Sequence, residues 1–127
     1  MTYTNEKLFN ALAAFNQAIA RVHFKSVKTM LHVKKKRSEM AELLEPYDEV
    51  KNDMVRKYGN GDELDTGKLA PEPLAQFSRQ WNELNNAAVD FDFGQKIKLS
   101  ELKEANALPS AIELEILENF IEVDIEE

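Results

Sequence analysis

The chain has 127 residues, 43% of them hydrophobic and 31% charged, so it is long enough for one domain with a core and too apolar for wholesale disorder. It contains no cysteine, which excludes a disulfide framework, a thiolate metal site and a cysteine nucleophile. We expect a soluble, intracellular protein, because no secretory signal is visible and no run of about 18 apolar residues could span a membrane.

The net charge of −7 is divided unevenly along the chain. Residues 1–60 carry eleven Lys or Arg and seven Asp or Glu, whereas residues 61–127 carry five and sixteen. Residues 21–37 hold seven cations and no acid, and the acids concentrate after Glu101. Three interpretations stay open: the basic segment binds nucleic acid, the acidic end binds a basic protein, or both charged segments are simply solvated.

An apolar stripe predicts a first helix over residues 5–21, and Thr4 is suited to cap it through its hydroxyl oxygen. Residues 22–25 alternate between apolar and polar side chains and predict a short strand. The stripe recurs every three or four residues, at Leu8, Leu12, Phe15, Ile19 and Val22.

A long helix is predicted over residues 26–58, and its apolar residues follow a heptad-like spacing that suits packing along another helix. Pro46 lacks the N–H that would bond the carbonyl of Glu42, so we expect a kink or a restart there. An αα-hairpin leaves apolar surface that a partner or a second copy could cover. The candidate protein-interaction residues on this helix are Met40, Leu43, Tyr47 and Met54.

The glycine- and proline-rich residues 59–73 predict a loop, and the apolar stripe that follows predicts a helix over 74–88 that folds back along the long helix. Residues 89–99 alternate like one bent strand or a small hairpin. Ser100 is expected to cap a short helical turn. A capping box, Ser110 with Glu113, opens a final helix over residues 110–121.

The residues suggest no reaction. His23 and His32 lie nine residues apart and neither follows a Glu-x-x-His pattern, so no metal site is predicted. The glycines of residues 59–67 do not have the spacing of a phosphate-binding loop, and no serine sits in a nucleophile elbow. We therefore predict no catalytic residue, no cofactor and no enzymatic activity.

Two charged segments are candidate binding sites. Glu115, Glu118 and Glu122 would share one face of the final helix, and such a row of carboxylates could imitate a phosphate backbone and inhibit a nucleic-acid enzyme. Lys34, Lys35, Lys36 and Arg37 are the weaker candidate, for nucleic acid, because few aromatic residues accompany them and no DNA-binding motif surrounds them. Nucleic acid is therefore an unlikely partner.

Two parts of the chain carry a family resemblance. They are residues 43–59, Leu-Leu-Glu-Pro-Tyr-Asp-Glu-Val running on to Arg-Lys-Tyr-Gly, and residues 96–102 with Leu108-Pro109 and the acidic ending. Both parts resemble a family of small uncharacterised proteins of tailed phages and prophages. The resemblance implies a phage or prophage origin, an accessory role, and a location in the host cytoplasm or the virion. The resemblance implies no catalytic or binding residue.

Together these patterns predict one mainly α (α+β) domain over residues 1–127. We expect a long kinked helical hairpin, a small two- or three-stranded β-sheet and a C-terminal helix. The expected function is binding to a phage structural protein or a host protein, as a tail or other virion component, an assembly factor or a chaperone. The alternatives are an acidic inhibitor of a host defence or nucleic-acid enzyme and, third, nucleic-acid binding through residues 21–37.

Overall fold

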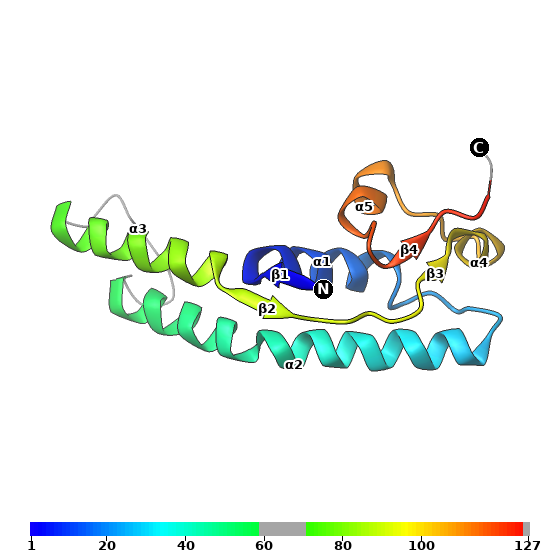
Figure 1. The fold of residues 1–127 in the computed structure, drawn as a ribbon, viewed down its shortest axis with the longest axis horizontal. Coiled ribbons are helices and arrows are strands. Elements are labelled where there is room, and N and C mark those ends of the chain that lie inside the picture. The colour runs from blue at the N-terminus through cyan, green and yellow to red at the C-terminus, as the bar shows by residue number, and fades with distance from the viewer. Residues whose placement is uncertain (59–70, 126–127) are drawn as a thin grey trace.

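The computed structural model describes residues 1–58 and 71–125, which form a mainly helical fold with two small sheets. This confirms the predicted fold class. Figure 1 shows α2 (Val27–Tyr58) running the length of the molecule, with α3 (Pro71–Asn86) and α1 (Asn5–Ala18) end to end along one side of it. Both α1 and α3 run antiparallel to α2, so α2 packs against two helices. Its pairing with α3 is the predicted hairpin.

Helix α1 begins where the sequence predicts. The Thr4 hydroxyl accepts the backbone N–H of Lys7 at 3.1 Å, as an N-cap should. The helix ends at Ala18, three residues before the predicted end. Residues 22–25 do not form the predicted strand. Their alternating burial is real, since Phe24 is buried and His23 is exposed, but no strand pairs with them and they simply connect α1 to α2.

Helix α2 continues through Pro46, so the predicted restart does not occur. Figure 1 shows the helix bending toward α3 in its second half, as expected from the missing hydrogen bond. Pro46 and Glu42 are both exposed, so the unbonded carbonyl faces water.

The predicted loop over residues 59–73 lies mostly outside the described residues, and residues 71–73 belong to α3. Two prolines fit this first turn because its N–H groups have no partner within a helix. Helix α3 ends at Asn86, two residues before the predicted end. Its buried Phe77 packs in a small cluster with Met54 and Tyr58 of α2.

The β-structure differs from the prediction in its pairing. Strand β1 (Thr2–Thr4), which the sequence did not indicate, pairs antiparallel with β2 (Ala88–Asp90). Strand β3 (Ile97–Lys98) pairs parallel with β4 (Ile121–Glu122). Each strand thus finds a partner from a distant part of the chain, and the hairpin predicted within residues 89–99 is not formed.

The final predicted helix is shorter than expected. Helix α5 (Ala111–Ile116) opens with the predicted capping box, in which Ser110 and Glu113 bond each other's backbone N–H groups at 3.2 and 2.9 Å. The chain then turns, and the carbonyl of Phe120 accepts the N–H of Ile97 at 2.8 Å. This strand pairing replaces the last turns of the predicted helix over 110–121.

Helix α4 (Leu99–Glu104) begins one residue before Ser100, so Ser100 is not its N-cap. Instead, the backbone N–H and hydroxyl of Ser100 donate to the carboxylate of Asp124 at 2.9 and 2.5 Å. A side chain from the C-terminal segment therefore caps α4, and sequence-local patterns do not reveal such a cap.

Aromatic side chains from four separate segments of the chain meet in the main core. Phe93 and Phe120 stack with their ring centres 4.6 Å apart, and Phe15, Phe91 and Tyr3 pack around them at 5.9–6.4 Å. These rings come from α1, β1, the connection after β2, and the turn before β4. The core thus ties both ends of the described chain to α1.

Helices α3 and α1 meet head to tail. The backbone N–H of Asn5 donates to the carbonyl of Ala87, and its side-chain amide donates to the carbonyl of Leu84, both at 3.0 Å. Donors at the start of one helix thus satisfy acceptors at the end of another, and the two helix dipoles align favourably.

Candidate functional site

The interaction residues predicted on α2 belong to the core. Met40, Tyr47 and Met54 are at most 6% exposed, and they pack against α1 and α3 of the same chain. The prediction that they form a docking surface is therefore wrong, because the chain covers this stripe itself. Leu43 lies to one side of the stripe and is 39% exposed. The expected self-association through the stripe loses its structural basis.

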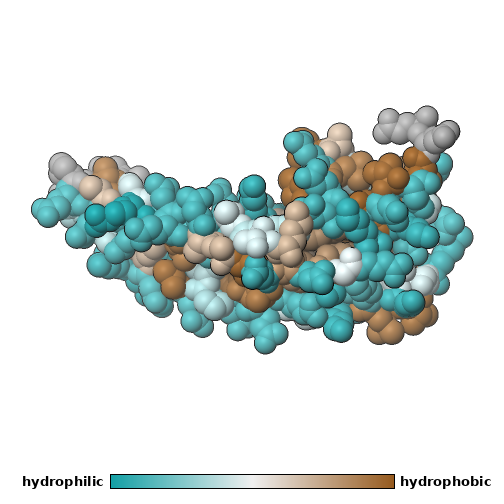
Figure 2. All heavy atoms as spheres, in the orientation of Figure 1, coloured by the Kyte–Doolittle hydropathy of each residue, from teal (hydrophilic) through white to brown (hydrophobic). Residues whose placement is uncertain are grey.

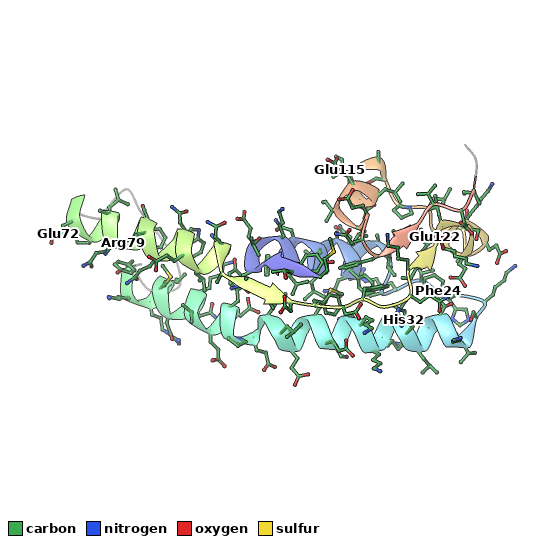
Figure 3. The ribbon with its side chains drawn as sticks, viewed as in Figure 1. Phe24, His32, Glu72, Arg79, Glu115 and Glu122 are labelled. Carbon is green, nitrogen blue, oxygen red and sulfur yellow. The ribbon has the colours of Figure 1, made fainter. Side chains whose placement is uncertain are left out.

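The structure separates the three predicted acidic residues. Glu115 lies on α5 and Glu118 on the turn that follows it, whereas Glu122 lies on β4. Figure 3 shows Glu115 and Glu122 on different parts of the C-terminal segment. Because the helix ends at Ile116, the predicted row of three carboxylates on one helix face does not exist. Glu115 and Glu118 stay close, because they lie three residues apart, at the end of α5 and in the turn that follows it.

Glu115 and Glu118 line a groove between α5 and the start of the chain. Its volume is about 390 Å³, and we call it the α5 groove. Its walls are formed by β1 and α1 on one side and by α5 and the following turn on the other: Met1, Thr2, Tyr3, Lys7, Asn10, Ala11, Glu115, Ile116, Glu118 and Asn119.

The α5 groove combines apolar and acidic surface. Met1 and Ile116 are 69% and 42% exposed, so hydrophobic surface is available at its entrance. Tyr3 is buried at the base of the groove, where desolvation raises the pKa of its hydroxyl despite the opposing hydrogen bond with Asn119. The tyrosine is therefore neutral near pH 7, and the charged side chains of the groove are its two glutamates and Lys7, beside the amino group of Met1.

Neither glutamate of the groove is neutralised by an ion pair within residues 1–58 and 71–125. The ion pairs there join Lys36 to Glu39 and Arg56 to Asp53. Both groove carboxylates are exposed, so they can meet a cation brought by a partner without first losing an internal one.

The apolar surface continues beyond the groove. Ile112 is 70% exposed and lies one helical turn from Ile116 on α5, and Leu108 just before the helix is 55% exposed. Figure 2 shows hydrophobic side chains gathered over α5. The i, i+4 spacing of the two isoleucines is visible in the sequence, but spacing alone does not tell whether the helix face that they form is buried.

The basic segment is not one continuous cationic surface. Lys36 donates to Glu39 and to the backbone carbonyl of Asp92 at 3.1 and 2.9 Å, and the Arg37 side chain donates to Asn16 at 2.7 Å. Lys34 and Lys35 are exposed. Two of the four predicted nucleic-acid residues thus have structural partners, which weakens the case for a phosphate-binding stripe.

The described residues hold no cluster of three or more His, Cys, Asp or Glu side chains that could bind a metal ion. In the same ranges, no helix combines the length and the apolar character needed to cross a bilayer.

Comparison with family models, with curated proteins and with solved structures of known proteins found no match.

Proposed function

We propose that this protein acts without catalysis, by binding another protein through the α5 groove. The observation that carries the proposal is the juxtaposition of exposed apolar surface, Met1 and Ile116, with two carboxylates that have no ion pair among the described residues, Glu115 and Glu118. An apolar patch bordered by charge is a common composition for a specific protein interface.

The occupant that fits this composition is a basic, amphipathic segment of a partner protein. Its apolar side chains would contact Ile116, Ile112 and Met1, and its Lys or Arg side chains would pair with the two glutamates. Charge complementarity of this kind accelerates association and excludes acidic competitors more than it increases affinity.

The resemblance to small proteins of tailed phages and prophages supports an accessory role in this proposal. The partner would then be a phage structural protein, with the chain acting as a virion or tail component, an assembly factor or a chaperone. The alternative, an inhibitor of a host enzyme, would use the same two carboxylates. The identity of the partner distinguishes the two.

The test begins with affinity capture of the tagged protein from infected or prophage-induced cells, with nuclease treatment, and continues with the purified partner. We expect Glu115→Lys with Glu118→Lys to weaken binding about tenfold or more in calorimetry, because each lost charge pair is replaced by repulsion. Ile116→Asp should weaken it similarly by placing a charge in the apolar contact.

The matched control is Glu104→Lys with Glu122→Lys, which changes the net charge equally at exposed positions outside the groove. It should leave the affinity within about twofold at physiological salt, where charges farther apart than about 8 Å are largely screened. Equal losses in both double variants would refute the groove as the binding site. Capture of a tail or capsid protein supports the accessory role, and capture of one host enzyme supports the inhibitor.

A further inference from the structure

A second cavity is lined by α2, β3 and α4 and is positively charged. Its volume is about 210 Å³, and it lies between the first two turns of α2, the segment leading into β3, and α4. We call it the basic pocket. The side chains that the following argument uses are Lys28, Thr29, His32, Lys96, Lys98 and Glu101.

Three lysines and one glutamate line the basic pocket, so its formal charge is positive although the whole chain carries −7. Within residues 1–58 and 71–125, none of these lysines forms an ion pair. The single acid is already engaged, because the Thr29 hydroxyl donates to the Glu101 carboxylate at 3.0 Å. The local field therefore favours an anion.

His32 lines this cavity on one side. Its ring meets Phe93 edge to face, with the ring centres 5.0 Å apart. Figure 3 labels His32 on α2. Gly94, whose φ of 75° favours glycine, also lies beside the imidazole, because a Cβ at that position would be in van der Waals contact with Cε1 at 3.6 Å.

The Nε2 atom of His32 is buried and has no hydrogen-bond partner in the described part of the chain. Buried polar atoms of proteins are nearly always paired, and exceptions point to a functional role or to a bound group. His32 lines the basic pocket, so an anion bound there would neutralise the neighbouring ammonium groups and would accept a hydrogen bond from this nitrogen once the imidazole turns toward the cavity.

We propose that the basic pocket binds a phosphate group, either inorganic phosphate or a small phosphomonoester. Several oxygen acceptors on one small dianion match an imidazole and three lysines, whose ammonium groups act as point charges toward phosphate. A volume of about 210 Å³ accommodates such a group but is below the range typical of larger ligands. The pocket shares no lining residue with the α5 groove, so this inference is independent of the proposed function.

The test titrates the whole protein with inorganic phosphate at low, constant ionic strength. It follows the imidazole resonances of His32 by NMR and the heat of binding by calorimetry. We expect saturable binding with a shift of the His32 signals. Lys96→Met with Lys98→Met should weaken the binding about tenfold, because it removes two of the three positive charges of the pocket.

The matched control is Lys34→Met with Lys35→Met, which removes two exposed lysines from α2 outside the basic pocket. It should change the affinity less than about twofold, because salt screens charges farther away than the Debye length. A parallel titration with glycerol phosphate identifies the source: tighter binding than inorganic phosphate indicates a phosphomonoester, and equal binding indicates phosphate itself. Unchanged His32 resonances, or equal losses in both lysine variants, would overturn the proposal.

Discussion

Single side chains from the C-terminal segment complete structures that begin elsewhere in this fold. Asp124 is the clearest case, because its carboxylate accepts the hydroxyl and the backbone N–H of Ser100 at the start of α4. A carboxylate at this position also interacts favourably with the helix dipole. The pKa of Asp124 lies below its ordinary value of 3.8, first because of the hydroxyl and second because of the N–H.

This lowered pKa predicts a pH dependence of stability. The folded state holds Asp124 ionised more strongly than the unfolded state does, so the stabilisation is present above pH 3.8 and is lost as the pH falls below that value through the folded pKa. Asp124→Asn should therefore lower the urea midpoint at pH 7, and its difference from the wild type should shrink toward pH 3.

Glu122→Gln is the control, since Glu122 is exposed and two residues away. Its effect should be small and should not follow the same pH profile. A difference between wild type and Asp124→Asn that stays constant from pH 7 to pH 3 would contradict the assignment of the cap to the ionised carboxylate.

Lys51 is a charged residue that packs among aromatic side chains, a position that its residue type does not predict. It occupies a position of the buried stripe of α2, and its ammonium lies 4.6 Å from the ring centre of Phe9, 5.6 Å from that of Tyr47 and 5.7 Å from that of Trp81. These rings belong to α1, α2 and α3. Cation–π attraction thus makes a charged residue acceptable where three helices meet.

At the scale of elements, α2 tolerates a proline because its missing hydrogen bond faces water. Pro46→Ala restores a backbone donor for the carbonyl of Glu42 and a better helix former at an exposed position. We expect it to stabilise the fold by about 1–2 kcal/mol, less than the full helix-propensity difference because proline also restricts the unfolded chain. Chemical denaturation measures this change.

Glu45→Ala is the neighbouring control and should change the stability by less than about 0.5 kcal/mol, as is usual for exposed positions. Destabilisation by Pro46→Ala would instead mean that the bend of α2 is required for packing against α1 and α3.

Local patterns predicted the helices well and the strands poorly. The starts of α1, α2 and α5 follow from a Thr cap, an apolar period and a capping box, which are all interactions within a few residues. The pairing of β1 with β2 joins the first residues to residues 88–90, and no local pattern carries that information. The predicted end of α5 was wrong for the same reason, because the Phe120 carbonyl accepts the N–H of Ile97, a residue from a distant segment.

The same limit applies to the candidate sites: residues close together in sequence could be identified, and residues brought together by tertiary structure could not. Glu115 and Glu118 were identifiable from the sequence because they are neighbours on one short segment. Met1 enters the α5 groove only through tertiary structure. The sequence offers His32 only as a potential metal ligand, and the burial of its Nε2 and its contacts with Phe93 and Gly94 come from tertiary structure.

At the scale of the whole molecule, the buried residues divide unequally. The main core involves α1, most of α2 and the C-terminal segments, whereas Met54, Tyr58 and Phe77 form a separate, smaller cluster between α2 and α3. Few buried apolar contacts mean a low local free energy of opening. The α2–α3 end should therefore open without unfolding of the main core.

Hydrogen exchange followed by mass spectrometry tests this division. The backbone amides of α3 should exchange faster than those of α1. Phe77→Ala should accelerate exchange in α3 while α1 keeps its protection, because the variant removes the buried side chain that α3 contributes to the smaller cluster. Equal acceleration in both helices would show that the molecule opens as a single unit.

The order in which the ribosome releases the chain matters for a core of this kind. Phe120 stacks on Phe93 and packs against Tyr3 and Phe15, so it emerges after every ring that it contacts. Until then, a nascent chain holds these apolar side chains without their last neighbour and is exposed to chaperones and proteases. The main core thus closes only after Phe120 has left the ribosome, and a product that stops before Phe120 leaves the apolar side chains of that core uncovered.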